Sequence, residues 1–212
     1  MKHISVLLFL ACAPAAMAQK WEVGAGVGGA FYNSQTFSNA VAGNANASLA
    51  TGIVASAWLA NNSQSRWGGE LRYDYENTSL KLSSGGTTAS FAGDTQAIHY
   101  DVVYHFASQE ASIRPFVAGG AGIKVFQGTG KESVYQPLQG IGLLTKTNDL
   151  TALVSVGGGV KFNFGSRMQL RLEVHDYMSP FPTKVIVPNQ GTKTSGGWLM
   201  DFVPMAALGI TL

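Results

Sequence analysis

Residues 168–175, MQLRLEVH, alternate between apolar and polar side chains at every position. The even positions are apolar, and the odd positions are polar or charged, including Arg171 and Glu173. A period of two is typical of a β-strand whose two faces meet different surroundings. This stretch therefore predicts a strand with one apolar face and one ionic face.

The same alternation recurs along the chain and predicts eight strands in all. The other seven segments are 21–32, 47–59, 67–76, 98–106, 114–126, 152–163 and 198–212. The expected long connections are 33–46, 83–94, 129–148 and 179–196, and the short ones are 61–66, 107–112 and 164–166. Connections that alternate in length indicate an up-and-down meander, and outer-membrane barrels combine long external loops with short periplasmic turns.

Composition excludes several classes of protein. Only 12% of the 212 residues are charged, against roughly 25% in soluble domains. Hydrophobic residues make up 46%, which excludes a disordered chain, and a net charge of +2 is too small for a nucleic-acid binder. The single cysteine excludes a disulfide scaffold. No segment has the roughly 18 consecutive apolar residues of a membrane-spanning helix.

The sorting of charge between strand faces predicts which face meets lipid. Large apolar residues occupy one face of nearly every strand, in greater number than a narrow eight-stranded lumen holds. The opposite face carries glycines and the charges, and a lipid-facing Arg or Lys costs about 2–4 kcal/mol at mid-bilayer. The charges of this face are Glu22, Glu70, Arg72, Asp74, Asp101, Lys124, Lys161, Arg171, Glu173 and Asp201. We therefore expect an all-β, eight-stranded antiparallel up-and-down transmembrane β-barrel; a soluble exported barrel is the alternative.

The N-terminus predicts export. Lys2 and His3 precede the apolar run 4–12, and Ala16-Met17-Ala18 fits the small-x-small cleavage rule. We expect residues 1–18 to be a cleavable signal peptide and residues 19–212 to form the barrel domain. A lipoprotein signal ending at Cys12 is the alternative; on the main interpretation the mature chain has no cysteine.

Residues 114–122, RPFVAGGAG, are similar to a Pro-aromatic-x-Gly-x-Gly pattern that enters the fifth strand in a known group of proteins. Over about residues 20–212 the chain resembles the eight-stranded outer-membrane barrel superfamily of the OmpA transmembrane domain, OmpX and the Opa proteins. It departs from that family at Leu212, where members usually end in an aromatic residue that the assembly machinery reads. It departs again at Pro204 inside the last strand, where we expect a bulge.

The resemblance implies an envelope or surface-interaction role in the outer membrane, without catalysis, cofactor or metal. Its implied partners are outer-membrane lipid, lipopolysaccharide, the barrel assembly machinery and an extracellular ligand held by the loops, with no nucleic acid.

The inward face supplies the candidate site, a network of ion pairs that fills the lumen. Buried charges need partners because an unpaired one costs several kcal/mol. The residues expected in this network are Glu70, Arg72, Asp101, Lys124, Arg171 and Glu173. A narrow gated pore through the same residues is the alternative function.

Histidines on the polar parity raise a third possibility, a barrel enzyme that modifies lipid A. The residues concerned are His99, Asp101, His105 and His175. Their parity turns them toward the lumen and away from lipid, and no serine stands beside one of them in a His-x-Ser arrangement on the same strand. We therefore expect them to fill the lumen, neither catalysing a reaction nor binding a metal.

Overall fold

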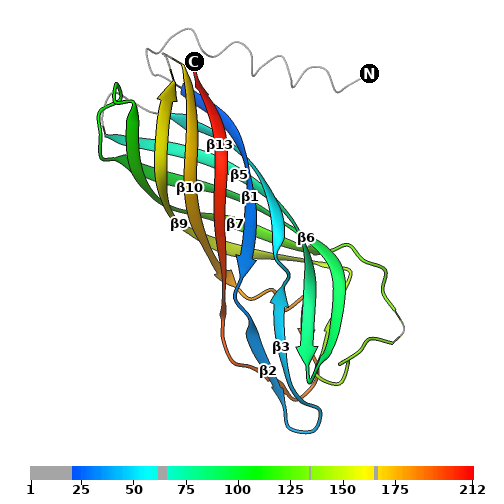
Figure 1. Ribbon diagram of the computed structural model, residues 1–212. Coiled ribbons are helices and arrows are strands. Elements are labelled where there is room, and N and C mark those ends of the chain that lie inside the picture. The colour runs from blue at the N-terminus through cyan, green and yellow to red at the C-terminus, as the bar shows by residue number, and fades with distance from the viewer. Residues whose placement is uncertain (1–20, 62–65, 134, 165–166) are drawn as a thin grey trace, which may run out of the picture.

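The computed structural model describes residues 21–61, 66–133, 135–164 and 167–212, so the predicted signal peptide lies outside the described residues. The described chain is all-β (Figure 1). None of its segments is a helix long and apolar enough to cross a bilayer. The strands are β1 (Trp21–Tyr32), β2 (Gln35–Asn39), β3 (Gly43–Leu49), β4 (Gly52–Asn61), β5 (Trp67–Ser84), β6 (Thr87–His105), β7 (Ile113–Gly128), β8 (Gly142–Leu144), β9 (Asn148–Phe164), β10 (Met168–Pro180), β11 (Ile186–Pro188), β12 (Thr192–Thr194) and β13 (Trp198–Thr211).

Eight long strands pair in a closed ring. Each is antiparallel to its neighbours in the order β1, β4, β5, β6, β7, β9, β10 and β13. Pairing of β13 with β1 completes the ring, because Glu22 stands opposite Thr211 and Phe31 opposite Phe202. The predicted meander is therefore confirmed. Both ends of the described chain lie at the end of the barrel with the short turns (Figure 1).

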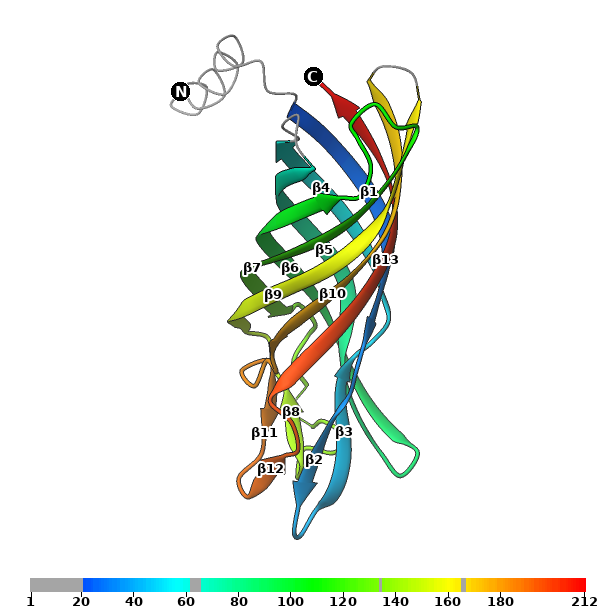
Figure 2. The same cartoon turned by 90° about the vertical axis from the view of Figure 1, so that its left-hand side faces the viewer.

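Two of the predicted long loops are wrong, because they are largely strand. The range 33–46 holds β2 and the start of β3, which form a hairpin. The range 83–94 holds the tip of the β5–β6 hairpin, whose turn places Gly85 and Gly86 at φ 53° and 84°. Positive φ costs glycine little, which suits a two-residue hairpin turn. The predicted strand 47–59 is instead divided between β3 and β4. Both hairpins project from the barrel wall at the loop end (Figure 2).

The other two long connections fold back against these hairpins. Short strand β8 pairs with β11, and β12 pairs with β2. The loop end is therefore built from hydrogen-bonded strands contributed by four connections.

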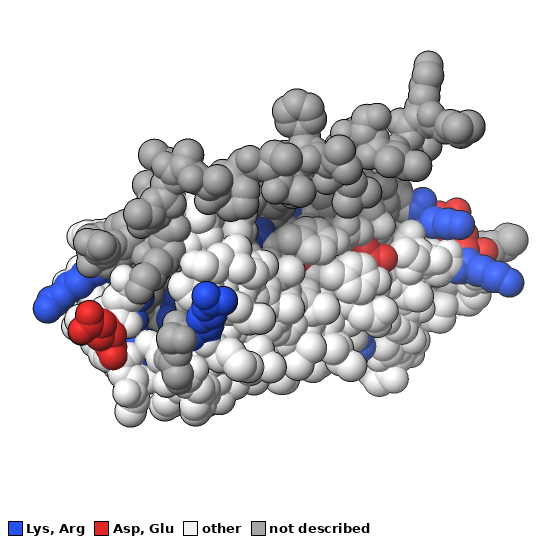
Figure 3. Space-filling model, turned by 90° about the horizontal axis from the view of Figure 1, so that it is seen from above, with Lys and Arg blue, Asp and Glu red and all other residues white. Residues whose placement is uncertain are grey.

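The outward face of the barrel is apolar, and the inward face is ionic. Outward side chains such as Ile98 and Tyr100 are 43% and 55% exposed, whereas Arg72 and Arg171 are fully buried. In the space-filling view, charged residues gather toward both ends of the visible face, and uncharged residues cover most of the band between them (Figure 3). This is the reverse of a soluble barrel and matches a lipid-facing exterior.

Toward the loops, the inward face of the same strands becomes apolar. The inward positions of β5 change from Glu76 and Thr78 to Leu80 and Leu82. A buried cluster fills this end, consisting of Phe37, Ala45, Ala47, Leu49, Leu80, Leu82, Ala89, Phe91, Phe126, Ile141, Leu144, Phe181, Val185, Ile186 and Leu199. This cluster gives the two hairpins a buried apolar face, which is why they are ordered strands and not loops.

Pro204 is accommodated without the expected bulge. The register between β13 and β1 is the same at Met205, opposite Gly28, as at Phe202, opposite Phe31. Pairing is interrupted only at the two positions between them, which include Pro204. The missing proline N–H therefore interrupts the seam with β1 locally, while Pro204 still stands opposite Val174 of β10.

Candidate functional site

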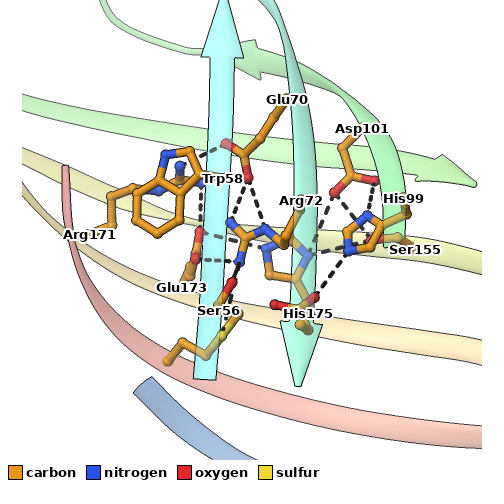
Figure 4. Close-up of polar contacts among 12 residues, drawn as sticks. Ser56, Trp58, Glu70, Arg72, His99, Asp101, Ser155, Arg171, Glu173 and His175 are labelled. Atoms are coloured by element: carbon orange, nitrogen blue, oxygen red, sulfur yellow. Dashed lines mark hydrogen bonds and ion pairs between the residues drawn. The ribbon is translucent and has the colours of Figure 1, made fainter. Parts of the chain in front are cut away.

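Four of the predicted lumen residues form one ionic layer, drawn in Figure 4. Arg72 places Nη2 2.6 Å from Glu70 Oε1 and Nη1 2.8 Å from Glu173 Oε1. Arg171 places Nη1 2.7 Å from Glu70 Oε2 and Nη2 2.7 Å from Glu173 Oε2. Each carboxylate thus accepts from both guanidinium groups. Such paired, charge-assisted hydrogen bonds are among the strongest that side chains make.

The layer continues toward the short-turn end through two residues outside the predicted site. Lys161 Nζ lies 2.9 Å from Glu22 Oε2, and Arg171 Nη1 lies 3.4 Å from Glu22 Oε1. The Trp58 ring stacks under Arg171, with its centroid 4.5 Å from the guanidinium carbon, and donates its indole N–H to Glu22. Three carboxylates therefore face three cations, which is the balance that burial demands.

Asp101 lies in a second layer, built around histidine. His99 Nδ1 is 3.0 Å from Asp101 Oδ1, and its Nε2 is 3.2 Å from Asp74 Oδ2. An ionised carboxylate only accepts hydrogen bonds, so an imidazolium that donates from both nitrogens satisfies this arrangement. Tyr177 also donates to Asp74, at 2.7 Å.

A serine that sequence reasoning missed joins this second layer. Ser155 Oγ lies 3.3 Å from Asp101 Oδ2 and 3.5 Å from His175 Nδ1 (Figure 4). Alternation along a single strand does not reveal it, because Ser155 stands on β9, opposite Tyr177 of β10. Ser155, His175 and Asp101 are fully buried inside the barrel wall. The grouping resembles a nucleophile with its base in composition, and the serine hydroxyl contacts both the carboxylate and the imidazole inside the barrel.

Lys124 lies in a third layer, nearest the loops. Its Nζ is 2.9 Å from Glu76 Oε1 and 2.6 Å from Asp201 Oδ2. Tyr32 and Thr95 donate their hydroxyls to Glu76. The ammonium also lies 5.5–5.6 Å from the ring centroids of Tyr32, Phe126 and Tyr177. Lys124 therefore stands where the ionic interior meets the apolar cluster.

Glycines on the inward face make room for these layers. A Cβ on Gly120 would lie 2.4 Å from Asp101 Oδ1, and one on Gly157 would lie 2.6 Å from His175 Nδ1. These distances are shorter than real Cβ contacts, so a larger residue at either position displaces the network. Parity predicted that the charges point inward, but only the strand register decides which of them share a layer.

His105, the remaining histidine of the predicted set, is also buried, near the short-turn end of the barrel, and its Nδ1 lies 3.2 Å from the Arg66 carbonyl. It belongs to none of the three layers. Among the described residues, no group of three or more His, Cys, Asp or Glu side chains is placed to hold a metal ion.

Comparisons with known proteins agree with this architecture. The family model described as outer membrane protein beta-barrel domain matches residues 4–183. OprG from Pseudomonas aeruginosa is similar in structure, with a TM-score of 0.62, 12% identity, and coverage of 92% of this chain and 96% of OprG. Neisserial surface protein A gives 0.53, 12%, 90% and 96%, and outer membrane protein AlkL, solved in lipid bilayers, gives 0.54, 13%, 94% and 94%. No curated protein matches the chain.

Proposed function

This chain belongs to the outer membrane protein beta-barrel family, and from that premise we propose that it is a non-catalytic envelope barrel whose loop end makes surface contacts. Its location is the outer membrane. The observation that carries the proposal is the filling of the lumen by side chains. Arg72, Arg171, Glu70 and Glu173 are at most 4% exposed, and the apolar cluster lies beyond them at the loop end.

The ionic layers are proposed to be structural. An eight-stranded lumen is just wide enough for side chains to fill it. Each of the three layers joins strands that are not neighbours in the barrel, by ion pairs in the first and third layers and by hydrogen bonds of Tyr177 and Ser155 in the second, so the layers hold opposite walls together. The proposed partners are the membrane lipid and lipopolysaccharide around the apolar face, the barrel assembly machinery, and an extracellular ligand at the loops.

Planar-bilayer recording tests the closed lumen. Folded protein, checked by its heat-modifiable migration on SDS gels, is added to the bilayer, and a sixteen-stranded porin in the same membrane serves as the positive control. We expect no conductance steps from this protein. Reproducible steps at the same protein concentration would favour a narrow pore and overturn the proposal.

A second assay tests the absence of catalysis. Purified protein is incubated with lipid A, and fatty-acid release is measured. Buried Ser155 and His175 predict no release. Release that disappears in the variant His175→Ala would show that the lumen residues react with lipid and would contradict a structural role.

A further inference from the structure

The β5–β6 hairpin has an open edge at the loop end. Strand β6 pairs with β5 from Thr87 onward, but its pairing with β7 starts only at Gly93. Over Thr87–Ala92 one side of β6 therefore has no neighbouring strand. Figure 1 shows this hairpin extending past the barrel wall.

Strand geometry identifies the backbone groups that face this edge. The Ala92 carbonyl accepts the N–H groups of Thr129 and Gly130, at 2.8 and 3.1 Å, as the chain leaves β7. Backbone groups point to the same side at every second residue of a strand, so those of Ser90 and Thr88 point to this edge as well. Both residues are exposed, and no described residue hydrogen-bonds to their backbone there.

A groove runs between this edge and the connection that follows β7. It is a cavity of about 280 Å³, lined by Thr88, Ala89, Ser90, Phe91, Lys131, Ser133, Tyr135, Gln136, Pro137 and Leu144. Ala89, Phe91 and Leu144 are buried members of the apolar cluster and form an apolar floor. This volume suits two or three residues of an extended peptide and is too small for a helix.

The far wall of the groove is held in place by hydrogen bonds. The Gln136 side chain donates to the Leu144 carbonyl at 2.7 Å and accepts from the Leu144 N–H at 3.0 Å. Glu132 accepts the Lys146 N–H at 2.7 Å, and Gly130 lies against the ring of Phe91. The groove is therefore formed in advance of any ligand, which lowers the entropy cost of binding.

Charge gives the groove a preference. Lys131 is the charged residue of its lining, and it makes no ion pair with the described part of the chain. Between Thr87 and Ala92 the edge also lacks the charges and prolines with which exposed strands usually discourage pairing.

We propose that this groove binds an extended, acidic peptide segment of a partner protein as an added β-strand. The segment hydrogen-bonds to the backbone of Thr88 and Ser90, which is the β-augmentation mode of recognition. One side chain rests on the apolar floor, and a carboxylate side chain of the segment pairs with Lys131. The proposal rests on the proposed surface-interaction role and names the chemistry of the partner.

The test uses the full barrel in lipid nanodiscs and the blocked pentapeptide TVDVT as the probe. Amide resonances are followed during titration, and we expect the largest shifts at Thr88 and Ser90. A TVDVT analogue with one N-methylated backbone amide loses about one hydrogen bond to the edge and binds about tenfold more weakly. Ser90→Pro removes a donor from the edge without breaking pairing to β5, and it has the same effect.

Charge variants test the second half of the proposal. Lys131→Glu weakens binding of TVDVT and favours the peptide TVKVT. The matched control is Lys146→Glu, which makes the same change of charge in the same connection outside the groove and leaves the preference unchanged.

Three outcomes would overturn the inference. The first is shifts that spread over the barrel with no maximum at the β6 edge. The second is equal affinity of the N-methylated and unmodified peptides. The third concerns galacturonic acid, a sugar that carries a carboxylate. If it competes with TVDVT and binds more tightly, the groove is a sugar site. None of these changes the bilayer recording, so a silent lumen would stand even if the peptide failed to bind.

Discussion

Replacing Arg171 with methionine removes one cation from a buried layer while keeping most of the side-chain volume. In the wild type Arg171 contacts Glu70 and Glu173 at 2.7 Å and Glu22 at 3.4 Å. In the variant three carboxylates share the two remaining cations, Arg72 and Lys161. Removing one partner of a buried ion pair costs about 3–5 kcal/mol. We therefore expect the free energy of unfolding to fall by about that amount.

The measurement is urea unfolding of the refolded barrel in lipid vesicles, followed by tryptophan fluorescence. A change in the midpoint with an unchanged slope reports stability alone. The control is Lys146→Met, which removes an exposed lysine and is expected to change the unfolding free energy by less than about 0.5 kcal/mol.

A second substitution separates charge imbalance from lost packing. Glu70→Gln alone leaves two carboxylates with three cations, whereas the double variant with Arg171→Met has two of each. The double variant should therefore lose less stability than the two single losses together, by about 1–3 kcal/mol. The reasoning is refuted if Arg171→Met costs less than about 1 kcal/mol, or if the two losses simply add.

Three further predictions concern the wall, the lipid face and the apolar cluster. Gly120→Ala places a Cβ 2.0 Å from a backbone oxygen of the next strand and should lower the unfolding free energy by about 1–3 kcal/mol in the same urea assay, whereas Gly119→Ala, with 3.8 Å of clearance, should be neutral. Leu71→Arg on the lipid face, midway between Trp67 and Tyr75 of β5, should cost about 2–4 kcal/mol by urea titration, and Val41→Arg at the 97%-exposed hairpin tip should cost nothing measurable. Phe37→Ala removes a fully buried ring and should cost about 3–5 kcal/mol, seen as faster proteolysis of the loop end.

The sequence predicted those features that depend on period and parity. Alternation at 168–175 placed Arg171 and Glu173 on the inward face, where the structure has them. Parity carries no information about height in the barrel. Arg72 and Glu173 are 101 positions apart in sequence, yet their side chains meet at 2.8 Å because of the strand register. The strand register also places Asp101 and Lys124 in separate layers and brings Ser155 into the second one. Parity alone does not give this register.

The two hairpins were missed for a different reason, since the meaning of parity reverses along β5. Up to Tyr75 the outward residues are apolar and the inward residues are ionic, but from Asn77 onward the outward residues are polar, and from Leu80 the inward residues are apolar. The strand itself continues without a break. If apolar residues are expected on the outward face throughout, the predicted strand ends near Tyr75. In the structure the strand continues, and only the surroundings of its two faces change.

This reversal marks the boundary of the membrane on the loop side of the barrel. Tyr75 and Asn77 stand opposite Gln96 and Asp94, so the outward face of β6 becomes polar at the same level as that of β5. On the short-turn side of this level the exterior meets lipid, and charge is stable only inside the barrel. On the loop side the exterior meets water, and burial of apolar side chains again stabilises the interior. Lys124 lies at the junction, in contact with Glu76 on one side and with the Phe126 ring on the other. One continuous set of strands therefore builds two kinds of interior, and the low charge content of the chain follows from the longer, lipid-facing part.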